Sequence, residues 1–172
     1  MKFINWIKSL FAPSKAEGVQ APLTKTPVNV SSSSTTAYEW AMTQLGVKEI
    51  KGYKHDKQIQ KYLATVNLGG YSDETAWCAA FVNWCLAQAG IYGSDKPNAR
   101  SFLKVGRQVG RPEKGDVVIF WRESKNSWKG HVAFFVEYTP HGQVVVLGGN
   151  QGNCVCYKTY SADRVLGFRR FA

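Results

Sequence analysis

The sequence predicts an α+β domain, because helical patterns fill the first half of the domain and short strands fill the second. Between residues 37 and 105 apolar residues recur at helical spacing, whereas after Gly110 short runs rich in Val, Phe and Tyr alternate with turn signals. Helices followed by strands favour a helical layer packed on a small curled antiparallel sheet. A chain of 172 residues that is 44% hydrophobic is large enough to bury one such core.

Four helices are expected in the first half of this domain: residues 38–45, residues 56–66, the segment AWCAAFVNWCLAQ and residues 99–105. Asp56 caps the second helix. Ser72, Asp73 or Thr75 can cap the third, and Gly90 ends it.

Five strands are expected in the second half: DVVIFW, HVAFFVEY, QVVVLGG, CVCYKTY and RVLGFRRF. The turn signals TPHGQ, GNQGN and SAD separate the last four of them, and this spacing predicts an antiparallel meander.

Two further segments precede the domain. Residues 1–11 (MKFINWIKSLF) place their apolar side chains on one helical face, which predicts an amphipathic helix. This helix is too short to span a bilayer and lacks the apolar core of a signal peptide, so contact with a membrane surface and docking on a protein both stay open. Residues 12–36 are rich in Pro, Ser and Thr and predict a flexible linker, so the compact domain covers residues 37–172.

The charge of the chain indicates an anionic partner. There are 22 Lys and Arg residues against 12 Asp and Glu, a formal net charge of +10. Nucleic acid, a membrane surface and an acidic cell-wall polymer all fit this charge. The basic residues are spread along the chain without the basic helix and interleaved aromatics of a nucleic-acid reader, so we expect no nucleic-acid partner, and we expect a monomer.

The four cysteines are too few for a disulfide-rich secreted scaffold, so we expect mostly free thiols. Their spacing lacks the second pair of a zinc finger, and the histidines are scattered. We therefore expect neither a structural metal nor a cofactor.

Cys78 is the candidate nucleophile. In the first turn of its helix, free backbone N–H groups and the helix dipole would lower the pKa of its thiol. The alternative is an ordinary buried cysteine, and this is the interpretation we adopt for Cys85, two turns deeper in the same helix.

A thiol nucleophile needs a base, and His131 is the best of three histidines. His141 lies in a turn and His55 in a charged loop, whereas His131 begins a strand that can hold its ring. Alone it would be a structural histidine, but together with Cys78 it reads as a base. Asn150 and Gln151, at the end of the next strand, offer an amide to orient the imidazole, and we select Asn150 over its alternative role as a turn residue.

Four segments resemble the CHAP and NlpC/P60-type cysteine peptidases, which are papain-like peptidoglycan amidases and endopeptidases: AWCAAFVNWCLAQAG, PEKGDVVIFW, GHVAFFVEY and VVVLGGNQGNCVCYKTYSADRVLGFRR. The resemblance implies a papain-like fold from residue 38 onward, with Cys78 as nucleophile, His131 as base and then acid, and Asn150 as the orienting residue. Gly148 stands where many CHAP domains carry an acidic residue, and the second histidine of many NlpC/P60 domains is missing, which leaves a Cys-His-Asn triad.

The resemblance further implies a peptidoglycan hydrolase that cleaves an amide bond, either an endopeptidase or an N-acetylmuramoyl-L-alanine amidase. The sequence looks most similar to small phage endolysins. The resemblance therefore implies a protein that is made in the host cytoplasm and acts at the bacterial cell wall, and the sequence does not indicate its export route. Two alternatives are a non-catalytic module that binds cell wall or another anionic polymer, and a membrane-associated interaction protein that uses residues 1–11. The set of Cys78, His131 and Asn150 favours the enzyme. Trp77 and Trp128 flank the candidate site in sequence and could line a substrate groove, but buried packing is the expected role of either alone.

Overall fold

The computed structural model describes residues 35–171, so the expected amphipathic helix and most of the expected linker lie outside the described residues. Three α-helices come first: α1 (Ala37–Met42), α2 (Lys57–Ala64) and α3 (Cys78–Gln88). The 3₁₀-helix η1 (Ala99–Lys104) follows them, and a second one, η2 (Ala162–Arg164), precedes the last strand. The predicted order of helices before strands is confirmed.

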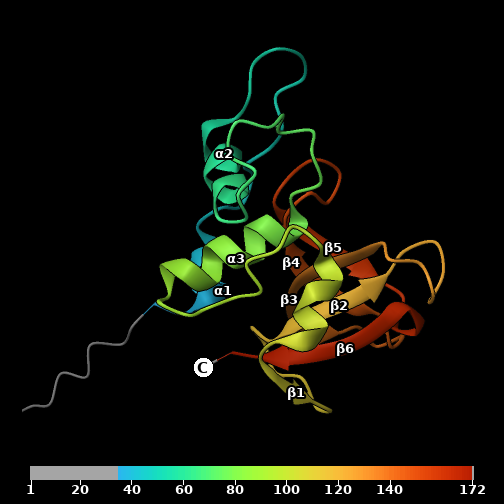
Figure 1. The fold of residues 1–172 in the computed structure, drawn as a ribbon. Helices are drawn as coiled ribbons and strands as arrows, with labels where there is room; N and C mark the ends of the chain where they lie inside the picture. Colours follow the sequence, from blue (N-terminus) through green and yellow to red (C-terminus); the bar gives the residue numbers. More distant parts are fainter. Residues whose placement is uncertain (1–34, 172) are drawn as a thin grey trace, which may run out of the picture. The chain divides into compact units, whose positions relative to one another are not determined.

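The strands form one antiparallel sheet: β1 (Arg107–Val109), β2 (Val117–Trp121), β3 (Gly130–Tyr138), β4 (Val144–Gly148), β5 (Cys156–Tyr160) and β6 (Val165–Arg170). Their order in the sheet is β1-β6-β2-β3-β4-β5. Figure 1 shows α1 and α3 beside this sheet, with α2 packed on α3 farther out. None of the helices within residues 35–171 is long and apolar enough to cross a lipid bilayer.

The first two helices begin at the caps that their sequences provide. Thr36 forms a capping box with Glu39 at the start of α1. The Asp56 carboxylate accepts hydrogen bonds from the backbone N–H groups of Gln58, at 2.8 Å, and Ile59, at 3.0 Å. The predicted cap of α2 is therefore confirmed.

The predicted cap of α3 is wrong. This helix follows Trp77, whose side chain makes no capping bond, and Trp77 packs against Tyr62 with ring centroids 5.9 Å apart. Asp73 lies upstream of the helix, fully buried, where its carboxylate accepts hydrogen bonds from the N–H groups of Ile50 and Asp56. The apolar contact of Trp77 therefore sets the start of α3, while Asp73 fastens the loop that leads into α2.

The meander is correct for β2 to β5 and wrong for the last strand. β6 crosses back to pair with β2, and β1, which the sequence did not suggest, adds to its outer edge. β6 thereby adds an apolar side chain to the sheet face opposite α3, where Phe168 packs on Phe135 of β3 at a centroid distance of 5.6 Å. The sheet thus has an apolar cluster on each face, and the larger one contains nearly the whole of α3.

Candidate active site

Cys78, His131 and Asn150 all line one pocket of about 560 Å³. Cys78 is the first residue of α3, His131 is the second residue of β3, and Asn150 follows the end of β4. The structure thus brings together three residues that lie far apart in the sequence. The predicted position of Cys78 in the first turn of its helix is confirmed.

Glycines allow the close contacts that build this pocket. A Cβ atom on Gly149 would lie 2.5 Å from the Trp77 ring and 2.7 Å from Cβ of Phe81, so the end of β4 touches the start of α3 through bare backbone. A Cβ atom on Gly130 would lie 2.8 Å from the carbonyl oxygen of Phe120. Only glycine fits these two places without displacing its neighbours.

The ring of His131 is held by aromatic packing and by one hydrogen bond. It is 2% exposed and packs beside the rings of Phe120 and Tyr160, at centroid distances of 6.4 Å and 5.3 Å, and these two rings are themselves 4.9 Å apart. Its Nε2 atom lies 3.0 Å from Oε1 of Gln151, which is itself buried. Packing and this bond together fix the direction of the imidazole.

The amide orientation of Gln151 fixes the tautomer of His131. Nε2 of Gln151 donates to the carbonyl oxygen of Cys156, which can only accept, so Oε1 must be the atom that faces the histidine. Because Oε1 also only accepts, the proton of the neutral imidazole sits on Nε2. Nδ1 is then the nitrogen with a free lone pair, as a base requires.

The orienting hydrogen bond expected from Asn150 is made by Gln151 instead. Asn150 has a φ of 55°, in the left-handed region, and the turn of the chain there leaves Asn150 on the pocket wall and carries Gln151 into the interior. The sequence contained both residues as candidates, but the backbone conformation that separates their roles has no clear sequence signal. A catalytic role for Asn150 stays a prediction.

Burial dominates the protonation of Cys78 and His131. It raises the pKa of the Cys78 thiol, although the backbone N–H groups of Val132 and Ala79 and the charge of Arg122 act in the opposite direction. The predicted lowering of this pKa is therefore wrong, because desolvation of the thiolate outweighs the helix terminus. Burial also lowers the pKa of His131 to about 4, against the hydrogen bond that the ring donates to Gln151, which raises it. The resting pair is a neutral thiol beside a neutral imidazole.

The remaining thiols and histidines have structural positions. All four cysteines are free, as predicted, and Cys85 is fully buried in the core. The thiols of Cys154 and Cys156 both donate to the backbone carbonyl of Gln151, at 3.4 Å and 3.2 Å. These two donors help to hold the turn that carries the orienting amide.

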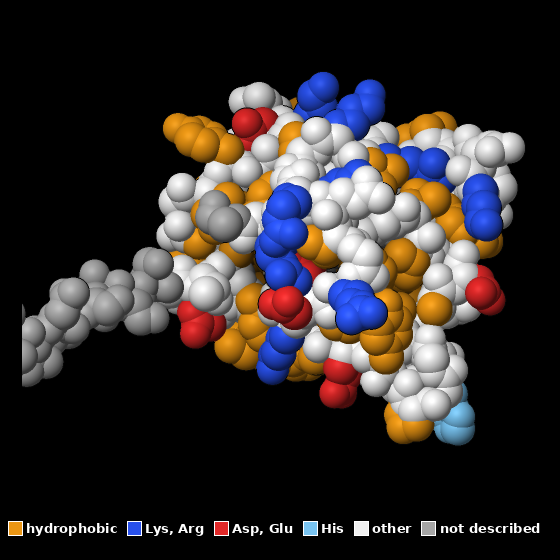
Figure 2. Space-filling view, turned by 90° about the horizontal axis from the view of Figure 1, so that it is seen from below, with side chains coloured by type: hydrophobic (Ala, Val, Ile, Leu, Met, Phe, Trp, Pro, Cys, Tyr) orange, Lys and Arg blue, Asp and Glu red, His pale blue; other side chains and the backbone are white. Residues whose placement is uncertain are grey.

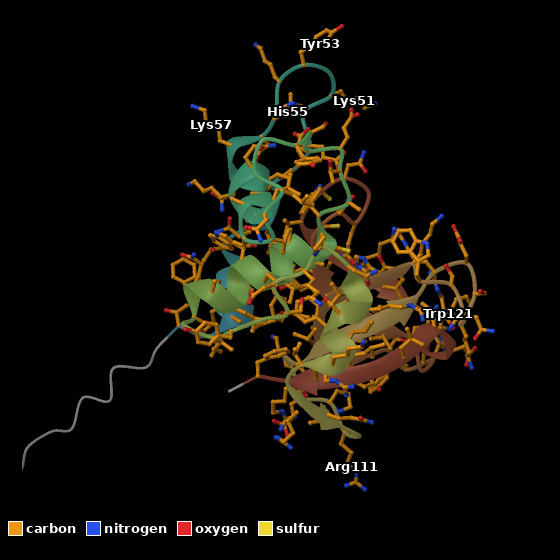
Figure 3. The ribbon with its side chains drawn as sticks, viewed as in Figure 1. Lys51, Tyr53, His55, Lys57, Arg111 and Trp121 are labelled. Atoms are coloured by element: carbon orange, nitrogen blue, oxygen red, sulfur yellow. The ribbon has the colours of Figure 1, made fainter. Side chains whose placement is uncertain are left out.

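His55 lies outside the pocket. Its Nδ1 atom is 3.1 Å from Oδ1 of Asp73, and Figure 3 shows it on the outer loop with Tyr53, remote from Trp121 at the end of β2. This loop fastens α2 to the segment before α3. His55 therefore does not compete with His131 for the role of base.

The two tryptophans that flank the site in sequence have different roles. Trp77 is fully buried, and its Nε1 donates to Oε1 of Glu49 at 2.8 Å, so its predicted packing role is confirmed. Trp128 is 72% exposed and lines the pocket, so the same prediction is wrong for it. Its indole offers an open apolar surface beside Cys78 and His131.

Comparison with known proteins finds one family model that matches part of the chain. Residues 70–150 match the model of the CHAP domain, and no curated protein matches the chain. Among solved structures, the chain is similar to the peptidoglycan hydrolase RipB from Mycobacterium tuberculosis, with 16% identity, a TM-score of 0.48, and coverage of 78% of this chain and 64% of that one.

Two further solved structures are similar. The P60 domain of an antigen from M. avium paratuberculosis has 16% identity and a TM-score of 0.45, with 78% of this chain and 90% of that chain covered. A lipoprotein-like NLP/P60 family protein from Staphylococcus aureus has 17% identity and a TM-score of 0.42, with 71% of this chain covered, and the alignment spans 44% of its own length. The matched segment 70–150 contains Cys78, His131 and Asn150. Residues 70–150 of this chain are therefore similar to the CHAP domain.

Proposed function

We propose that this protein is a peptidoglycan hydrolase that cleaves an amide bond of the cell-wall peptide with Cys78 as nucleophile and His131 as base. The observation that carries the proposal is the shared pocket, in which a helix-terminal thiol and a buried, oriented imidazole line the same cavity. The match of residues 70–150 to the CHAP domain supports the substrate class. We assign the orienting role to Gln151, because it makes the hydrogen bond to His131.

The reaction begins with transfer of the Cys78 thiol proton to Nδ1 of His131. The thiolate attacks the amide carbonyl carbon, and backbone N–H groups at the start of α3 stabilise the oxyanion. When the C–N bond breaks, the imidazolium returns its proton to the leaving amine. Water then attacks the thioester with His131 again as base, which releases the carboxylate product and restores the thiol.

Arg122 and the burial of the pair support this order of events. The Arg122 charge and the nearby N–H groups stabilise a thiolate, and the raised thiol pKa means that the thiolate forms when the proton is taken during the reaction. The low pKa of His131 keeps the base neutral and ready at neutral pH. Neither group needs a metal or a cofactor for these steps.

The test compares wild-type protein with Cys78→Ala and Cys78→Ser on purified peptidoglycan, with mass spectrometry of the released fragments. Wild type should release fragments with new amine and carboxylate ends, and both variants should release none while keeping the wild-type unfolding temperature. The fragment masses identify the bond, which distinguishes an endopeptidase from an amidase. Equal release by wild type and Cys78→Ala would end the nucleophile assignment.

The alternative of a non-catalytic binding module makes a different prediction in the same experiment. Such a module would sediment with the wall, and no fragments would appear with any of the three proteins. On the face shown in Figure 2, Lys and Arg side chains are spread among other types, which suits general attraction to an anionic wall. Assignment as a phage endolysin and a membrane role of residues 1–11 stay predictions from the sequence.

A further inference from the structure

The candidate pocket carries an excess of positive charge. Three basic side chains, Arg122, Lys129 and Arg164, and one acidic side chain, Glu123, line it. The Nζ atom of Lys129 lies 2.6 Å from Oε1 of Glu123, so these two charges neutralise each other. The guanidinium groups of Arg122 and Arg164 therefore determine the net positive charge of the pocket.

Arg164 is engaged by the protein itself. Its Nε and Nη2 atoms donate to the carbonyl oxygen of Trp121, at 3.3 Å and 3.1 Å. The same guanidinium lies over the rings of Trp121 and Tyr160, 5.5 Å and 5.9 Å from their centroids. Arg164 is a fixed cation at the edge of the pocket.

Arg122 is different, because its guanidinium has no hydrogen-bond or ion-pair partner within residues 35–171. Its side chain is exposed, and among residues 35–171 it makes no hydrogen bond and no ion pair. Its charge nevertheless acts on the reacting groups, since it lowers the pKa of both Cys78 and His131. The Arg122 guanidinium lies near the proposed nucleophile, and no anionic side chain within residues 35–171 neutralises it. It is therefore suited to bind an anionic group of the substrate.

The hairpin loop of residues 122–129, which joins β2 to β3 and carries Arg122, is held in place. Arg100 of η1 donates to the carbonyl oxygens of Lys129, at 3.1 Å, Lys125, at 3.0 Å, and Ser124, at 3.3 Å. The N–H of Arg122 donates to the carbonyl of Lys129 at 3.2 Å. Arg122 and Trp128 thus project from a braced wall of the pocket.

We propose that Arg122 binds a carboxylate of the substrate, so that the pocket selects peptides with a free carboxylate close to the scissile amide. The proposal rests on the proposed hydrolase function and adds the feature that its substrate must present. A guanidinium binds a carboxylate through two parallel hydrogen bonds, and this geometry gives both affinity and direction. The exposed indole of Trp128 offers a surface for the apolar part of the same peptide.

The first test measures binding without turnover. Cys78→Ala protein, with and without Arg122→Gln, is titrated with one purified soluble muropeptide, in its native form and after carbodiimide amidation of its carboxylates. Arg111→Gln is the matched control, because Arg111 is an exposed arginine near β1, far from Trp121 in Figure 3. Arg122→Gln should weaken binding of the native muropeptide about 10- to 100-fold and leave binding of the amidated one unchanged.

Two binding results would overturn the proposal. In one, Arg122→Gln and Arg111→Gln weaken binding equally, which indicates only general charge attraction. In the other, Arg122→Gln still distinguishes the native from the amidated muropeptide as strongly as its parent does. Both results are independent of hydrolysis, so they are separate from a failure of the proposed function.

The second test is kinetic and uses the active protein on the same two substrates. Arg122→Gln should raise KM for the native substrate about 10- to 100-fold and lower kcat by a smaller factor, because the thiolate also loses a stabilising charge. A loss of kcat at constant KM would mean that Arg122 acts on the thiol alone and not on the substrate. That result would also overturn the proposal.

Discussion

Oε1 of Gln151 lies 3.0 Å from Nε2 of His131, and the other end of the same amide is held by the carbonyl of Cys156. A neutral amide with both ends bonded can orient an imidazole and select its tautomer without placing a negative charge beside it. This differs from a carboxylate partner, which would stabilise the imidazolium and raise its pKa. The hydrogen bond between His131 and Gln151 therefore favours an imidazole that stays unprotonated at neutral pH.

Gln151→Ala should lower kcat about 10- to 100-fold, a fraction of what general acid–base catalysis contributes, because the ring loses its orientation. Gln151→Glu should retain more activity and move the acidic limb of the pH–rate profile to higher pH, because the carboxylate raises the pKa of His131. In ¹⁵N NMR, wild-type His131 should carry its proton on Nε2. If Asn150→Ala costs more activity than Gln151→Ala, the orienting role belongs to Asn150.

Cys85→Ala should lower the free energy of unfolding by about 1 kcal/mol, because it removes a buried sulfur from the core. Hydrolysis per folded molecule should equal that of wild type, since Cys85 does not line the pocket. Urea denaturation and the peptidoglycan assay at 25 °C measure the two effects. Loss of hydrolysis in a folded Cys85→Ala protein would contradict the separation between core and nucleophilic cysteines.

Gly149→Ala should lower stability by about 1–3 kcal/mol, the usual cost of an overpacked core, because its Cβ would press on Trp77 and Phe81. The same strain would separate the end of β4 from the start of α3, so activity should fall as well. Gly110→Ala is the control, since a Cβ there meets nothing within 4 Å. Equal unfolding temperatures for the two variants would refute the close contact.

The low pKa of His131 makes folding stability depend on pH. The unfolded chain binds the proton near the ordinary value of 6.5, whereas the folded chain binds it near 4, so protonation between these values favours unfolding. The stability that the neutral ring contributes is fully present above pH 6.5 and falls as the pH is lowered toward 4, by about 3 kcal/mol in total. The pKa of Asp73 is also lowered in the folded protein, from an ordinary value of 3.8. The stability that its carboxylate contributes is therefore lost only below pH 3.8, outside the pH range in which His131 titrates.

His131→Asn isolates this contribution. Denaturation curves at pH 7, 5.5 and 4.5 should show a steeper loss of stability for wild type than for His131→Asn, because only wild type takes up the proton at this position. Parallel curves for the two proteins would show that the buried imidazole is not the group that titrates.

The sequence was sufficient for the fold class and for selecting Cys78 and His131, which the structure places in one pocket. Cys78 and His131 were predictable because each stands at the start of a regular element, where local patterns are strongest. The choice between Asn150 and Gln151 was not, because it depends on a left-handed turn at one residue. The role of Trp128 also lay beyond the sequence, since it depends on which way a hairpin loop faces.

Other features depend on contacts between distant segments. β1 is a three-residue polar strand that exists because β6 passes beside it, and the return of β6 to β2 reflects the apolar face that Phe168 covers. The pKa of Cys78 followed burial, which the helix dipole alone does not reveal. Local patterns therefore predicted the elements, while tertiary packing decided their order in the sheet and the protonation of the thiol.

The bracing of the 122–129 hairpin by Arg100 has a consequence for how such a pocket can change. The Arg100 guanidinium donates to main-chain carbonyls, at residues 124, 125 and 129, and every amino acid supplies that group. Arg122 and Trp128, which take no part in the side-chain hydrogen bonds of Ser124 and Ser127 within the hairpin, can therefore be exchanged while the wall keeps its shape. Retargeting toward a different peptide chemistry would then require only a few substitutions in one hairpin.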